Sequence, residues 1–247
     1  MGKFPYALLA AIILISGCAM QPVQETFGDE KVATNAIESV SFKTADGFAI
    51  IGSLTKSGNK AAILMHQLGR DKGTYLSFAK KLADSNITSL AIDLRGHGAS
   101  IEQNAKRRPF TSFKDQDFRD MEKDAQAAKK FLEERGYSVE FAVGSSIGAN
   151  TALNFAAHDN TIKKIVLLSP GLNYKGIETQ GAAAGVKAKT LLVASSGDDE
   201  YSFASAKALA EEIPGSEFMQ MRNAGHGTFM FSGTFLEDDI VKWLLQD

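Results

Sequence analysis

The chain of 247 residues contains a single cysteine, Cys18, so it can form no disulfide within itself. Neither sign of charge is in excess, because 27 Lys and Arg stand against 29 Asp and Glu. This near balance argues against nucleic acid as a partner. Proline is scarce at five residues, and neither an internal repeat nor a low-complexity stretch is present. The 44% of hydrophobic and 23% of charged residues are typical of a globular protein, and the length suits one large domain.

Long hydrophobic runs are few, and the first of them lies at the N-terminus. Residues 7–15 are continuously apolar, and Lys3 is the only charged residue before Glu25. The run is too short to span a bilayer permanently, but it has the length of a signal-peptide core. The N-terminus therefore predicts a segment that directs export.

The run ends in Ile15-Ser16-Gly17-Cys18, which resembles the lipobox of bacterial lipoproteins. In that family the cysteine becomes the mature N-terminus and carries lipid, and stable anchoring needs two or more acyl chains. The resemblance implies a signal peptide over residues 1–17, lipidation of Cys18 and a tether over residues 18–38. Ala19 after the cysteine implies a place in the cell envelope at the outer rather than the inner membrane. An ordinary cleaved signal with a chance cysteine is the alternative.

The rest of the chain is organised around Gly144-Ser145-Ser146-Ile147-Gly148. An apolar run ending at Val143 predicts a buried strand, and residues 149–157 have helical composition and period. A strand that turns sharply into a helix strains the middle residue, and the two glycines leave the room that such a turn needs. The turn places the Ser146 hydroxyl above the sheet, at the positive end of the helix. This pattern resembles the nucleophile elbow of the α/β-hydrolase family, and the resemblance covers residues 39–247.

Eight segments predict strands, the first two of which are joined as a hairpin at Asp46-Gly47. They are residues 39–44, 48–55, 61–65, 89–92, 141–143, 164–169, 189–195 and 217–221. Helical spacing occurs in residues 75–85, 115–135, 149–157, 203–213 and 233–245. The order predicts an α/β fold: an eight-stranded, mostly parallel sheet with helices on both faces, as in α/β-hydrolases.

Many α/β-hydrolases insert a cap domain after the sixth strand. Here only residues 170–188 separate that strand from the next, so we expect no cap domain. The site should therefore be open and shallow. Its expected walls are the Gln67 loop, the polar loop of residues 101–113, and Tyr174.

The family resemblance implies a catalytic triad in the chain order nucleophile, acid, histidine. A serine hydroxyl needs a base to remove its proton, and the base needs a third group to orient it. Ser146 is the expected nucleophile, and His226, just past the last strand, is the expected base. Counted back from Pro214 through the helix, Asp198 occupies the position of the acid, and Asp199 is the alternative.

The backbone N–H groups of Leu68 and Ile147 are the expected oxyanion-hole donors. In the family the first of these loops begins His-Gly, whereas this chain has His66-Gln67. We interpret His66 as structural. Residues 93–100 match the family's Asp-x-Arg-Gly-x-Gly-x-Ser turn, whose role is also structural.

Together these features predict a monomeric, lipid-anchored serine hydrolase that cleaves small carboxylic esters, with short acyl chains preferred. No metal and no organic cofactor is implied. A thioesterase or a peptidase would use the same residues. The rival from another class is a non-catalytic envelope lipoprotein that keeps the fold as a binding surface.

Overall fold

The computed structural model describes residues 1–2 and 36–246. The predicted lipidation site Cys18 and nearly all of the predicted signal peptide and tether lie outside the described residues. The chain divides into two units, Met1–Thr34 and Asn35–Asp247, and the described helices and strands all belong to the second. Its first strand begins at Ile37, two residues inside the predicted tether.

Eight strands of five to eight residues build the sheet, and they correspond to the eight predicted segments. They are β1 (Ile37–Lys43), β2 (Phe48–Thr55), β3 (Lys60–Met65), β4 (Thr88–Ile92), β7 (Ser138–Ser145), β8 (Lys164–Leu168), β11 (Lys189–Ser196) and β12 (Glu217–Arg222). Their order is β12-β11-β8-β7-β3-β4-β2, with β1 beside β2. The six from β12 to β4 are parallel, and β2 is antiparallel to β4 and to β1. β7, which leads to Ser146, is thus central.

Two further strands extend the sheet past β2, where the sequence predicted only a polar loop. β5 (Glu102–Gln103) and β6 (Lys106–Arg107) form a short hairpin. Its turn residues, Asn104 and Ala105, both have positive φ, at 49° and 62°. A two-residue hairpin turn of this kind is usually predicted from the sequence Asn-Gly. Because Ala105 stands where the glycine is expected, the sequence did not predict this turn.

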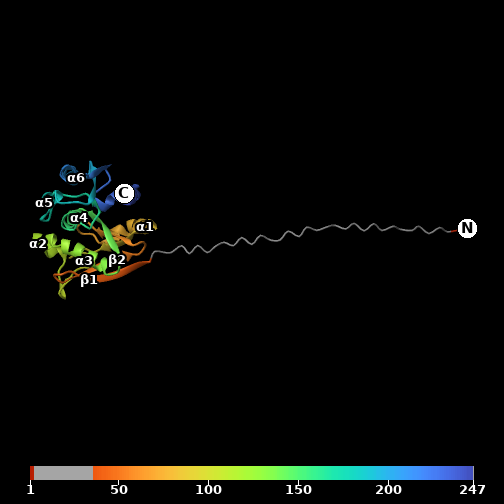
Figure 1. Ribbon diagram of the computed structural model, residues 1–247, viewed down its shortest axis with the longest axis horizontal. Helices are drawn as coiled ribbons and strands as arrows, with labels where there is room; N and C mark the ends of the chain where they lie inside the picture. The colour runs from red at the N-terminus through yellow and green to blue at the C-terminus, as the bar shows by residue number, and fades with distance from the viewer. Residues whose placement is uncertain (3–35, 247) are drawn as a thin grey trace. The chain divides into compact units, whose positions relative to one another are not determined.

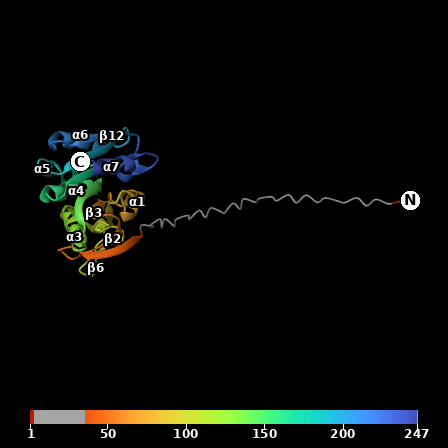
Figure 2. The same ribbon diagram turned by 45° about the vertical axis from the view of Figure 1, so that its right-hand side comes forward.

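Helices cover both faces of the sheet, as predicted (Figures 1 and 2). One face carries α3 (Glu122–Glu133), α4 (Ile147–His158) and α6 (Glu200–Glu212). The other carries α1 (Leu76–Asp84) and α7 (Leu236–Leu245). The single helix predicted over residues 115–135 is two, α2 (Asp115–Arg119) and α3, separated by a turn at Asp120 and Met121.

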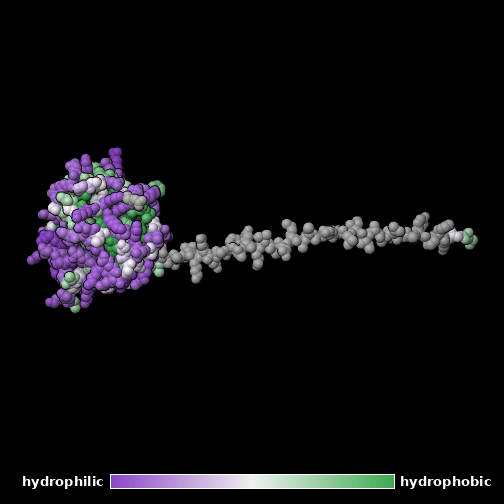
Figure 3. Space-filling view, viewed as in Figure 1, coloured by the Kyte–Doolittle hydropathy of each residue, from purple (hydrophilic) through white to green (hydrophobic). Residues whose placement is uncertain are grey.

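The core consists of two apolar layers, one on each face of the sheet. In β3, Ile63 and Met65 belong to one layer and Leu64 to the other. A strand buried on both faces has this pattern, and its apolar run gives no alternation. The face drawn in Figure 3 is mostly hydrophilic.

Residues 36–246 contain no cap domain, which confirms the prediction. Between β8 and β11 the chain forms only the hairpin of β9 (Asn173–Tyr174) and β10 (Ile177–Glu178), followed by the short helix α5 (Gln180–Ala183). Among the described residues, no helix combines the length and the apolar character that a membrane span requires.

Candidate active site

Ser146 lies at the sharp turn between β7 and α4. Its backbone has φ 54° and ψ −118°, a conformation that non-glycine residues rarely adopt. A Cβ atom on Gly144 would lie 2.1 Å from the carbonyl oxygen of Gly148, and one on Gly148 would lie 2.3 Å from that of Met65. The strand, the turn and the helix therefore pack too closely for any side chain at either glycine, as the elbow pattern predicted.

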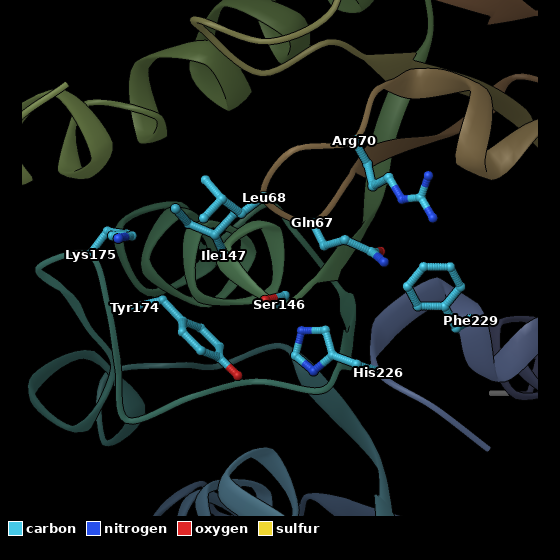
Figure 4. Close-up of a pocket in the computed structure, with 9 residues that line it drawn as sticks. All are labelled: Gln67, Leu68, Arg70, Ser146, Ile147, Tyr174, Lys175, His226 and Phe229. Carbon is cyan, nitrogen blue, oxygen red and sulfur yellow. The ribbon is translucent and has the colours of Figure 1, made fainter. Parts of the chain in front are cut away.

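Ser146 opens onto a pocket of about 330 Å³ (Figure 4). Nine residues from four segments line it: Gln67, Leu68, Arg70, Ser146, Ile147, Tyr174, Lys175, His226 and Phe229. Gln67 and Tyr174 are walls, as predicted. The predicted wall from residues 101–113 is wrong, because none of them lines the pocket and Phe110 instead stacks on His97, with ring centroids 4.2 Å apart.

The carboxylate that contacts His226 belongs to Asp199, not to Asp198. Nδ1 of His226 lies 2.8 Å from Oδ2 of Asp199. Asp198 instead accepts hydrogen bonds from the Ser195 hydroxyl at 2.6 Å and from the Gly225 N–H at 2.7 Å. The structure therefore favours the alternative, Asp199. A count of residues back from Pro214 does not report which of the two carboxylates faces His226.

Two serines that the sequence did not single out complete the surroundings of Asp199. The Ser202 hydroxyl donates to Oδ1 at 2.7 Å, and the Ser169 hydroxyl is a further donor. Burial raises the pKa of the Asp199 carboxyl, but the hydrogen bonds from His226, Ser202 and Ser169 outweigh it and hold the pKa below its ordinary value. The carboxylate is thus ionised and can orient an imidazole. Of these two serines, only Ser202 could have been found from the sequence, because it follows Asp199 by three residues and so lies in the first turn of α6.

Tyr174 reaches Ser146 from the β9–β10 hairpin. Its hydroxyl lies 2.8 Å from Ser202 Oγ and also interacts with the Ser146 hydroxyl. Burial raises the pKa of Tyr174 to about 12, against these hydrogen bonds, which lower it. The described residues contain no hydrogen bond between Ser146 and His226, although both line the pocket; nucleophile–base hydrogen bonds commonly tighten only around a substrate.

Leu68 and Ile147, the predicted oxyanion donors, both line the pocket beside Ser146. Ile147 is the first residue of α4, so its N–H has no acceptor within the helix. The hydrogen bonds of residues 36–246 include none donated by the backbone N–H of Leu68. Two N–H groups are therefore available to an oxygen atom placed between them.

The side chain of Gln67 joins the Leu68 loop to the elbow. Its Oε1 accepts from the Ser145 hydroxyl at 2.8 Å and from the Thr228 hydroxyl at 2.8 Å and backbone N–H at 3.2 Å. Gln67 thus fixes the loop through its side chain, where the family's usual glycine has none.

The other three histidines lie outside the pocket. His66 is buried, accepts at Nε2 from the Leu94 N–H at 3.0 Å and lies with Nδ1 2.8 Å from the Gln67 carbonyl, and burial lowers its pKa to about 4. His97 is likewise buried, and His158 is exposed beside Glu122. These positions agree with a structural role for His66, and of the four histidines only His226 lines the pocket.

The predicted turn at residues 93–100 is fixed by buried charges. Asp93 accepts from the Lys72 backbone and ammonium groups at 2.8 and 2.7 Å, while Arg95 binds Asp124 at 2.8 Å and Asp46 at 2.8 Å. Among the residues that the structure describes, no three His, Cys, Asp or Glu side chains are grouped to hold a metal ion.

Solved structures share this architecture at low sequence identity. An esterase from Exiguobacterium antarcticum has a TM-score of 0.70 at 14% identity, over 85% of this chain and 100% of that one. A dienelactone hydrolase from Anabaena variabilis has 0.65 at 16%, over 85% and 94%. Est1E from Butyrivibrio proteoclasticus, solved with ferulic acid bound, has 0.70 at 13%, over 83% and 98%. At such identities the likeness establishes the α/β-hydrolase fold.

A comparison with curated proteins found no match. Residues 57–203, however, match the family described as serine aminopeptidase, S33. This stretch is more than half of the chain and includes Ser146 and Asp199. The chain therefore belongs to the serine aminopeptidase S33 family, with the fold of the α/β-hydrolases.

Proposed function

We propose that this protein hydrolyses carboxylic esters, with Ser146 as nucleophile, His226 as base and Asp199 as the acid that orients it. The observation that carries the proposal is the 2.8 Å contact of His226 with Asp199 at a pocket that also exposes the strained Ser146. The esterases among the structures of the same fold support it.

The geometry suits acyl transfer through an acyl-enzyme. The Ser146 oxygen attacks the ester carbonyl carbon while His226 accepts the serine proton at Nε2, and Asp199 stabilises the imidazolium. The N–H groups of Leu68 and Ile147 bind the oxyanion. As the C–O bond breaks, His226 returns the proton to the departing alcohol, and a water molecule then releases the acid by the same steps in reverse order.

Ester hydrolysis is favoured over aminopeptidase activity by the charges around the pocket. An aminopeptidase must bind the ammonium group at the N-terminus of its substrate, and a carboxylate suits that purpose. None of the nine lining residues is acidic, and two of them, Arg70 and Lys175, are cationic. A substrate ammonium group would therefore meet like charge.

The test is labelling with a fluorophosphonate probe together with turnover of 4-nitrophenyl butyrate. We expect one label per chain at Ser146, and Ser146→Ala should abolish labelling and lower kcat by roughly 10⁶. Circular dichroism should show that the variant still folds. A chain that neither takes the label nor cleaves any ester would be a binding protein instead. Cleavage of amino-acid 4-nitroanilides in preference to esters would favour the peptidase.

We further propose that the protein is a lipoprotein of the cell envelope, anchored through Cys18 and acting as a monomer. The apolar run of residues 7–15 and the lipobox-like Ile15-Ser16-Gly17-Cys18 support this. The anchor would hold the hydrolase at a membrane surface while its substrate comes from solution.

A further inference from the structure

The charged residues that line the active-site pocket are all positive. Arg70 and Lys175 are the charged residues among its nine lining residues, and both are exposed. Neither forms an ion pair within residues 36–246. In Figure 4 they stand on opposite sides of Ser146. The pocket lining therefore offers positive charge to a substrate, and the carboxylate of Asp199 behind it is engaged by His226 and Ser202.

Arg70 is held in place by an aromatic ring. The central carbon of its guanidinium lies 4.8 Å from the centroid of the Phe229 ring, over the ring's face. Phe229 itself is 49% exposed, so the pair lies at the surface of the pocket. A cation over an aromatic face keeps its N–H edge free to donate. Phe229 thus fixes the direction of Arg70 while its hydrogen-bond donors stay available.

The carboxamide of Gln67 supplies a second donor on the same side of the pocket. The Thr228 backbone N–H can only donate, so the atom it meets must be the carboxamide oxygen. The amide nitrogen therefore faces the other way. No hydrogen bond within residues 36–246 is donated by it, and Figure 4 shows the end of the Gln67 side chain directed toward Phe229. Figure 4 shows Gln67, Arg70 and Phe229 gathered on one side of Ser146 and His226.

We propose that the substrate is an ester bearing a carboxylate, which is bound by the guanidinium of Arg70 and the side-chain N–H of Gln67. This inference rests on the proposed ester hydrolysis and names its substrate class. A planar guanidinium matches the two oxygens of a carboxylate, which a lysine ammonium cannot do. Lys175, on the other side, adds to the positive potential, but no aromatic ring of residues 36–246 lies against its ammonium group.

The test compares esters that differ only in this charge. One pair, 3-acetoxybenzoate and its methyl ester, carries the charge in the alcohol half. The other, mono-(4-nitrophenyl) glutarate and its methyl ester, carries it in the acyl half. The measured quantity is the ratio of kcat/KM for the charged ester to that for the neutral one, in wild type and variants. For at least one pair, Arg70→Met should lower this ratio about five- to tenfold. Arg70→Lys should lower it less, and added salt should lower it in wild type.

Arg135→Met is the matched control. Arg135 also stacks on a phenylalanine, with its central carbon 3.5 Å from the Phe131 ring centroid, but it lies beyond the C-terminus of α3 and does not line the pocket. This variant should keep the wild-type ratio for both pairs. A ratio that Arg70→Met leaves unchanged in both pairs would overturn the inference, while hydrolysis of the neutral esters would leave the proposed function standing.

A binding measurement separates the two proposals if no ester is cleaved. Calorimetry with 3-hydroxybenzoate and with glutarate uses the same carboxylates without any chemistry. Binding of either by wild type that weakens at least fivefold in Arg70→Met would support the carboxylate site even if ester hydrolysis failed. Absence of binding, together with absence of turnover, would overturn both.

Discussion

Nδ1 of His226 lies 2.8 Å from Oδ2 of Asp199, whereas the neighbouring Asp198 accepts a hydrogen bond from the backbone N–H of Gly225 at 2.7 Å. Two consecutive carboxylates therefore have different tasks. Asp199 orients the imidazole ring, and Asp198 fixes the loop from which that ring projects.

This division predicts unequal effects of the same substitution. Asp199→Asn should lower kcat by roughly 10⁴, because an amide at that position favours the wrong tautomer of the imidazole. Asp198→Asn should lower kcat less than about tenfold, since an amide oxygen can still accept from Gly225. Steady-state kinetics on both variants with one ester measure the difference. The reverse order of effects would return the acid to Asp198.

The dependence of kcat/KM on pH should reflect the uptake of a single proton on the acid side. The pKa of Asp199 lies below its ordinary value, so this carboxyl stays ionised as the pH is lowered through the range in which imidazoles titrate. The pKa of His66 is about 4, so that histidine stays neutral there as well. Neither Asp199 nor His66 should therefore add a second proton to the acid side of the profile, and we expect kcat/KM to fall there with a limiting slope no steeper than one. A slope of two, or a rate that rises toward acid, would contradict this assignment.

Chain-length dependence should reflect the missing cap. A fully buried methylene gains about 0.8 kcal/mol, which corresponds to about fourfold in kcat/KM. A pocket of about 330 Å³ without a cap domain can bury only part of a long chain. Acetyl to butyryl esters should therefore be cleaved best, with no jump in rate at an oil–water interface. A series of 4-nitrophenyl esters measures this; a rate that climbs through decanoyl, with interfacial activation, would show that the site encloses long chains.

The proposed anchor predicts the behaviour of a variant at the N-terminus. In a diderm bacterium the wild-type protein should partition into the outer membrane, and Cys18→Ser should remain unprocessed or be released. Membrane fractionation and mass spectrometry of the mature N-terminus distinguish these outcomes. Soluble mature wild-type protein with an unmodified Cys18 would exclude the anchor.

Local sequence signals were sufficient where one residue determines the backbone. Asp46-Gly47 predicted both the hairpin and the bounds of β2, Phe48–Thr55, which the structure has unchanged. The two glycines around Ser146 likewise predicted the elbow. The choice between Asp198 and Asp199 depended instead on a backbone turn at Gly197, with φ 91°, and on contacts with residues 223–226, which are distant in sequence. The spacing of apolar residues along the chain does not predict contacts between residues that are distant in sequence.

The pocket walls were harder to predict for the same reason. Arg70 and Phe229 meet although 159 positions separate them. Arg70 lies in a loop and Phe229 in the short 3-10 helix Gly227–Phe231, so no regular spacing links the two. The loop of residues 101–113 was expected at the pocket because it is long and polar. It forms the β5–β6 hairpin at the sheet edge instead, where Asn104 donates to the Gly47 carbonyl at 3.0 Å.

The bonds of Gln67 have a consequence for the history of this chain. A glycine at position 67 would leave the hydroxyls of Ser145 and Thr228 without their shared acceptor, and both residues are buried. Exchanging any one of the three alone would cost stability, so an ancestor could not have acquired them independently at no cost. In homologous sequences the three positions should therefore change together, with small apolar residues replacing both hydroxyls wherever position 67 is glycine.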